Sequence, residues 1–232
     1  MKVHEAYGRA VAQIGDPAFR PIMWLAVGAA ALVLAALVAA ALWAAAGVPD
    51  ESLGGWAQTL ADFAGGAAAL VAAWFLFPVI VTGVLGIFID DIAAAVERRH
   101  YPADPPGRDV PFLTGMGFGL RFAGLALMIN LLLLPAYAIS LFLPPLALFL
   151  FYFVNGYLLG REYFGQVGLR HVPFHAVREL ERRHRGRIFR AGIVGAIVLT
   201  VPVLNLVAPL VATAAMVHLW KDLAGRGEPA RG

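Results

Sequence analysis

Residues 155–220 decide the fold of this chain: NGYLLGREYFGQVGLRHVPFHAVRELERRHRGRIFRAGIVGAIVLTVPVLNLVAPLVATAAMVHLW. The first half of this stretch holds eight arginines between Arg161 and Arg190, and the second half, residues 191–220, carries no formally charged side chain. An arginine-rich segment joined to a long apolar one is typical of a chain that meets a membrane surface and then enters the lipid. The order of the two halves therefore predicts which part lies on which side of a membrane.

The arginine-rich half has a helical pattern. Phe174, Val177 and Leu180 recur at steps of three, which places them on one helix face. We expect residues 161–190 to form an amphipathic helix at a cytoplasmic membrane surface, where arginines reach anionic headgroups. A solvated charged face on a connecting helix is the alternative. The arginines expected at the lipid surface are Arg178, Arg182 and Arg185.

The apolar half has an unusual length for a membrane segment. One helical crossing needs about 20 residues and two need about 40, whereas residues 191–220 number thirty, with Pro202, Asn205 and Pro209 near the middle. A helical hairpin that enters and leaves by the same side fits this length and these breaks. Irregular backbone at membrane depth needs protein or water around it, so Asn205 at the tip is a candidate for lining an ion path. Gly192 predicts close packing against another helix.

Composition restricts the class of protein. The chain is 60% hydrophobic and 14% charged, which is typical of an integral membrane protein and leaves no soluble domain for nucleic-acid binding. Cysteine is absent and the histidines show no metal-ligand spacing, so we expect neither a metal site nor a cofactor. No pairing of a nucleophile with a base is visible, and we expect the protein not to be an enzyme.

The remaining segments complete a single all-α, polytopic membrane domain over residues 1–232. We expect two long transmembrane helices, two hairpins interrupted by prolines, and the cytoplasmic helix described above. Whether residues 122–160 and 191–220 cross fully or insert partly stays open. In chain order the parts are an N-terminal amphipathic segment (1–20), two crossing helices (21–99), the first interrupted hairpin (112–160), the arginine-rich helix (161–190), the second hairpin (191–220) and a flexible tail (221–232).

The distribution of positive charge predicts the orientation. All 18 lysines and arginines lie outside the apolar runs and their turns. They share one side if every apolar unit returns the chain to its starting side, so both termini should be cytoplasmic. Arg121, at the beginning of the uncharged run 122–160, marks either an ion path or a membrane edge.

The motifs in the second half of the chain resemble a known family, the CysZ-type sulfate permeases and the related etoposide-induced-protein domain. The matching residues are Asn155 to Leu158, Arg161 to Tyr163, Arg170, His171, Arg178, Arg187 and Val201 to Pro209. The resemblance implies an inner-membrane protein with two long crossing helices and two partly inserted hairpins. It further implies a homo-oligomer in the lipid bilayer that supports sulfate uptake. A non-transporting, membrane-organising scaffold of the same domain family is the alternative.

The resemblance also implies an anion-binding segment. The family's Pro-Gly-Leu-Arg turn corresponds here to Pro17, Ala18, Phe19 and Arg20, so the arginine is kept while the glycine and leucine are replaced. A helix start with a guanidinium suits an oxyanion such as sulfate or sulfite. The Asp16 carboxylate would compete for the same donors. The alternative is that Arg20 anchors the helix to lipid phosphates at the membrane edge.

Overall fold

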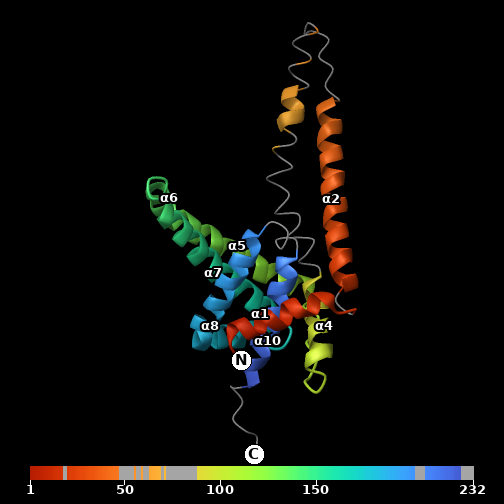
Figure 1. Cartoon of the computed structure of the whole chain (residues 1–232), viewed down its shortest axis with the longest axis vertical. Helices are drawn as coiled ribbons and strands as arrows, with labels where there is room; N and C mark the ends of the chain where they lie inside the picture. The colour runs from red at the N-terminus through yellow and green to blue at the C-terminus, as the bar shows by residue number, and fades with distance from the viewer. Residues whose placement is uncertain are drawn as a thin grey trace, which may run out of the picture. The chain divides into compact units, whose positions relative to one another are not determined.

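The computed structural model describes residues 1–17, 20–46, 55, 59, 63–68, 71, 88–201 and 207–225. The described part of the chain is all-helical and contains no strand, as the sequence predicts. The chain forms two compact units, one of Met1–Arg20 with Ile89–Gly232 and one of Pro21–Phe88 (Figure 1). The elements are α1 (Val3–Ala12), η1 (Gln13–Gly15), α2 (Arg20–Ala46), α4 (Ile89–His100), α5 (Phe112–Leu132), α6 (Leu134–Ser140), α7 (Pro144–Leu169), α8 (Phe174–Thr200) and α10 (Ala208–Gly225).

The unit of Pro21–Phe88 is represented mainly by α2. This helix contains the apolar segment Val27–Ala40 and has no polar face, because alanine, leucine and valine occupy nearly every position. A helix that is apolar all round is suited to lipid or to a protein interior. The second crossing helix, predicted within residues 63–89, lies largely outside the described residues.

The core of the larger unit is α10. Every residue from Leu210 to Trp220 is buried, and α1, α4, α7 and α8 all pack against this helix. An apolar helix without a polar face can be covered on all sides in this way. The predicted break within residues 191–220 is present, since α8 ends at Thr200 and α10 begins at Ala208. Asn205, at the predicted tip, lies outside the described residues.

Three glycines bring α7 and α8 into backbone contact. A Cβ atom added at Gly192 would lie 1.9 Å from the carbonyl oxygen of Gly156 and 2.5 Å from the backbone nitrogen of Gly160. A Cβ atom at Gly160 would lie 2.5 Å from the carbonyl oxygen of Ile188. Only glycine permits such an approach, so the close helix packing predicted at Gly192 is confirmed. The Tyr7 hydroxyl then ties α1 to this pair by donating to the Ala191 carbonyl over 2.8 Å.

The arginine-rich segment differs from the prediction, because residues 161–190 do not form one helix. α7 continues to Leu169, residues 170–173 turn, and α8 runs from Phe174 to Thr200 with a kink at His184. Pro173 explains the turn, since proline disfavours helical backbone at the preceding residue and has no N–H for the ladder. The apolar spacing beyond the turn is helical as predicted, but the basic residues line two helices.

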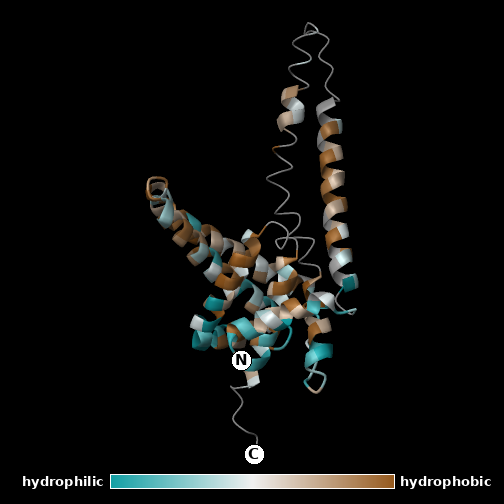
Figure 2. Ribbon diagram, in the orientation of Figure 1, coloured by the Kyte–Doolittle hydropathy of each residue, from teal (hydrophilic) through white to brown (hydrophobic). Residues whose placement is uncertain are grey.

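The first interrupted region forms a hairpin of α5 and α6 against α7. Pro135 lies in the first turn of α6 and Pro144 begins α7. The turn between these helices exposes Leu141 by 81% and Phe142 by 89%, and it is brown in Figure 2. Among the described residues, one helix segment, Leu113–Leu132 in α5, is long and apolar enough to cross a membrane, and none of it is buried in the protein.

Candidate functional site

The predicted anion-binding segment is only partly described, because Ala18 and Phe19 lie outside the described residues. Pro17 and Arg20 are both exposed. The Arg20 backbone N–H already donates to the Asp16 carbonyl over 3.0 Å, so this donor is not available to an anion. The Asp16 carboxylate, however, lies 3.3 Å from the Arg99 guanidinium. This pairing offsets the negative charge that would compete with an anion at the Arg20 side chain.

Arg121 lies in the middle of α5, nine residues after the helix begins, and is exposed. Its guanidinium lies 5.3 Å from the centroid of the Phe174 ring at the beginning of α8. A cation over an aromatic face is a favourable contact for a charge within an apolar helix. A cavity of about 240 Å³ adjoins the two side chains.

The three arginines predicted at the lipid surface differ in their surroundings. Arg182 and Arg185 are exposed. Arg178 is half-buried, donates to Glu181 over 2.9 Å, and lies 5.3 Å from the Phe174 ring centroid. Arg178 therefore makes contacts within α8, whereas the side chains of Arg182 and Arg185 are exposed at the protein surface.

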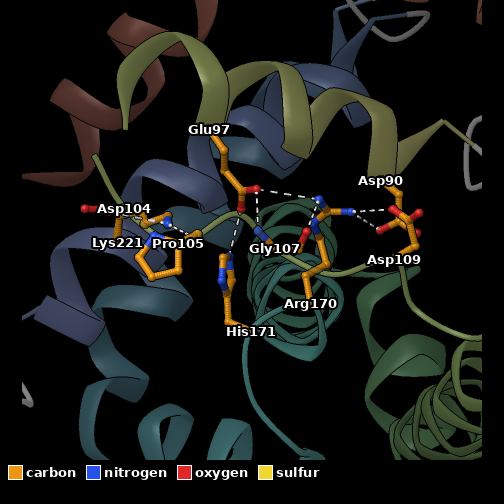
Figure 3. Close-up of polar contacts among 9 residues, drawn as sticks. All are labelled: Asp90, Glu97, Asp104, Pro105, Gly107, Asp109, Arg170, His171 and Lys221. Carbon is orange, nitrogen blue, oxygen red and sulfur yellow. Dashed lines mark hydrogen bonds and ion pairs between the residues drawn. The ribbon is translucent and has the colours of Figure 1, made fainter. Parts of the chain in front are cut away.

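An ionic cluster around the buried Arg170 joins α4, the loop after it, and the turn between α7 and α8. Arg170 has only 1% of its side chain exposed, and its Nη1 lies 2.8 Å from an Asp90 oxygen (Figure 3). Its Nη2 lies 3.5 Å from a Glu97 oxygen, and Nη1 also lies 3.9 Å from an Asp109 oxygen. The Arg108 N–H donates to the Arg170 carbonyl over 2.8 Å. Because carboxylates surround this arginine, it is not placed to receive an oxyanion.

Glu97 is the second centre of this cluster. It is buried, accepts the Gly107 N–H over 3.0 Å, and lies 2.8 Å from His171 Nε2. Burial raises the pKa of this carboxyl, but the hydrogen bonds from His171 and Gly107 and the nearby Arg170 charge outweigh burial and lower the pKa overall. The His171 ring stacks on Trp220 of α10 at 5.8 Å between centroids. We call Asp90, Glu97, Arg170, His171 and Trp220 the Arg170 cluster. Its contacts hold α4, the turn between α7 and α8, and α10 together.

Sequence reasoning missed a basic pocket between the beginning of α1 and α8. The pocket has a volume of about 560 Å³, and the side chains that line it from α8 include Arg187 and Arg190. Lys2, which precedes α1, and His4 in the first turn of α1 also line the pocket. Its charged lining side chains are all basic, and we call it the basic pocket. The lining residues near the N-terminus and those from α8 lie more than 180 residues apart in the sequence, and no local sequence pattern connects them.

Asp222 holds one wall of the basic pocket in place. Its two carboxylate oxygens lie 2.6 Å from Arg187 Nη2 and 2.7 Å from the Met1 amino group. Asp222 does not line the pocket. The exposed Glu5 carboxylate accepts the Lys2 N–H over 2.9 Å. Even with these two acids counted, basic groups are in excess around the pocket, so the arrangement favours an anion.

Comparison with known proteins identifies the family. The family described as "Sulfate transporter CysZ/Etoposide-induced protein 2.4" matches the chain over residues 6–209. Because this match covers most of the 232 residues, the chain belongs to that family, and the resemblance noted from the sequence motifs is confirmed. None of the curated proteins compared with the chain matches it. The family and the apolar helix Leu113–Leu132 together indicate a membrane protein.

Proposed function

We propose that this member of the sulfate-transporter family binds a divalent oxyanion, sulfate or sulfite, and supports its uptake across an inner (plasma) membrane. The observation that carries the proposal is the basic pocket, in which Lys2, Arg187 and Arg190 line one cavity without an acidic side chain among them. Ile193 and Val194 supply an apolar wall. Hydrogen bonds from charged donors to an anion are stronger than those between neutral groups.

Arg190 is the pocket residue best suited to contact the anion. Its Nε donates to the Gly186 carbonyl over 3.2 Å, which holds the side chain along α8. Arg187, by contrast, is engaged by Asp222. A charge-assisted hydrogen bond contributes about 1.5–3 kcal/mol. Loss of Arg190 should therefore weaken oxyanion binding by about ten- to a hundredfold.

The segment Pro17, Ala18, Phe19 and Arg20 is proposed as a second contact for the oxyanion. Its exposed guanidinium and the pairing of Asp16 with Arg99 support this assignment. The ion path would then pass Arg121 and Asn205. At Arg20, lysine keeps the charge but loses the planar fork, so Arg20→Lys should bind with an affinity between those of the wild type and Arg20→Ala.

The test of the basic pocket uses the purified full chain. We expect calorimetric titration with sulfate and with sulfite to show binding that Arg190→Gln weakens by at least about tenfold. We also expect slower uptake of labelled sulfate into proteoliposomes containing the variant. Arg183→Gln is the matched control, because Arg183 lies on the same helix, is exposed and pairs only locally with Glu179. Wild-type affinity in Arg190→Gln would remove the pocket from the proposal, and a wild type that binds neither anion would remove the transport function.

The proposal includes a topology with two crossing helices, two hairpins and both termini in the cytoplasm. Lysine and arginine are absent from residues 122–160 and 191–220, including the proline-containing turns within them, and this absence supports the topology. We expect reporters fused at either end to show cytoplasmic exposure. A C-terminal reporter in the periplasm would contradict the hairpin interpretation of residues 191–220.

A non-transporting, membrane-organising oligomer is the alternative function. The observation that favours it is the exposed apolar turn between α6 and α7, where Leu141 and Phe142 offer a surface to another protomer or to lipid. This function predicts homo-oligomers and lipid binding without sulfate flux. Proteoliposome uptake together with the mass of the purified assembly distinguishes the two functions.

A further inference from the structure

A second cavity lies between α7 and α8, on a different face of α8 from the basic pocket. It has a volume of about 250 Å³. From α7 it is lined by Phe153, Tyr157 and Arg161, and from α8 by Arg185 and Phe189, among others. We call it the aromatic crevice. Along α7 the lining changes from aromatic to basic at Arg161, the first charged residue after the uncharged run 122–160.

The apolar half of the crevice continues as an aromatic surface along α7. Phe149 and Phe153 stack at 5.5 Å between centroids, and Phe153 meets Phe189 at 5.1 Å. Phe153 is 49% exposed and Tyr157 is 38% exposed. Residues four apart share one helix face, so these rings lead in a line to Arg161. A phenylalanine face that ends in a tyrosine and an arginine is characteristic of the boundary between lipid tails and headgroups.

The basic half of the crevice carries excess positive charge. Arg161 donates to the Tyr157 hydroxyl over 2.6 Å, and its Nε lies 2.9 Å from Glu181. Arg178 shares the same Glu181 carboxylate. Arg185 lines the crevice, is exposed, and has no ion-pair partner among the described residues. Glu181 also lines the crevice, so the lining holds two guanidinium groups, Arg161 and Arg185, and one carboxylate, and this excess of positive charge favours an anionic phosphate.

We propose that the aromatic crevice binds one anionic phospholipid, with its phosphate between Arg161 and Arg185 and an acyl chain along Phe153 and Phe149. Charge complementarity with a phosphodiester and the continuous apolar surface beside it select this ligand. A free oxyanion would leave the aromatic half unused, whereas a phospholipid covers both halves. The site stands apart from the basic pocket, and its occupancy does not depend on the proposed transport function.

The experiment measures binding of short-chain phosphatidylglycerol to the purified full chain in detergent, by titration and by native mass spectrometry. We expect saturable binding that Arg185→Gln weakens by about tenfold, since one charge-assisted contact is lost. Phe153→Ala should weaken it as well, because acyl-chain contact is lost. Arg183→Gln, which removes an exposed arginine of α8 outside the crevice, should bind as the wild type does. Thermal unfolding of each variant checks that the fold is kept.

The comparison arms separate the sources of phosphate. We expect inorganic phosphate and an uncharged short-chain diacylglycerol each to fail to displace the phospholipid at matched concentration. Displacement by inorganic phosphate would assign the crevice to a free oxyanion and overturn the proposal. If Arg183→Gln and Arg185→Gln weakened phospholipid binding equally, the effect would be one of nonspecific surface charge. This outcome would also overturn the proposal. Sulfate binding to Arg185→Gln reports on the basic pocket separately and should be unchanged.

Discussion

Replacing Gly192 with alanine should destabilise the protein strongly, by about 3 kcal/mol or more. The added Cβ atom would lie 1.9 Å from the Gly156 carbonyl oxygen and 2.8 Å from the Cα atom of Gly160. Both obstacles are backbone, so α7 and α8 must separate before the methyl group fits. The separation would also disturb the Ala191 carbonyl that accepts the Tyr7 hydroxyl bond. Thermal unfolding of the purified chain in detergent measures the loss.

Gly186→Ala is the matched control for this prediction. Gly186 lies on the same helix, and a Cβ atom there meets nothing within 4 Å. Alanine favours a helix over glycine by about 1 kcal/mol, so this variant should unfold at the wild-type temperature or above it. If Gly186→Ala and Gly192→Ala had the same unfolding midpoint, the close packing of α7 on α8 would not be a source of stability.

Replacing Arg170 with methionine should cost about 3–5 kcal/mol, because the buried Glu97 carboxylate loses one of its positively charged partners. Glu97 is buried, and Asp90 loses its 2.8 Å contact with the guanidinium. The expected result is a large fall in the unfolding midpoint. The exposed pair of Arg183 with Glu179 provides the control, since Arg183→Met should cost about 0.5 kcal/mol or less.

The double variant Arg170→Met with Glu97→Gln tests whether the unpaired Glu97 charge causes the loss of stability in Arg170→Met. It removes both charges, so part of the stability lost in the single variant should return.

The pH dependence of stability due to Glu97 has a defined sign. The pKa of Glu97 is lowered in the fold, so the charged carboxylate stabilises the protein above its unfolded pKa and this contribution is lost as the pH falls through the folded pKa. Glu97→Gln should lack this acid-dependent part. An unchanged acid profile would mean that Glu97 does not act through its charge.

The local features of this protein followed from its sequence. The helical class and the end of α8 at Thr200, just before Pro202, are set by apolar spacing and by proline. Gly192 predicted a close helix contact because a glycine in an apolar helix allows the backbone of a neighbouring helix to approach closely. The family resemblance rested on residues that are near one another in the chain, and it too is confirmed.

The tertiary structure alone decided which charges far apart in the sequence face each other. Arg170 is a buried arginine among carboxylates, whereas its position in an arginine-rich stretch suggested a surface. The basic pocket exists only because α1 packs against α8 and brings Lys2 beside Arg190. Periodicity and capping act over one or two helical turns and are readable along the chain. The partner of a charge far away in sequence depends on how whole helices pack, and packing is the sum of many contacts that no single stretch of sequence contains.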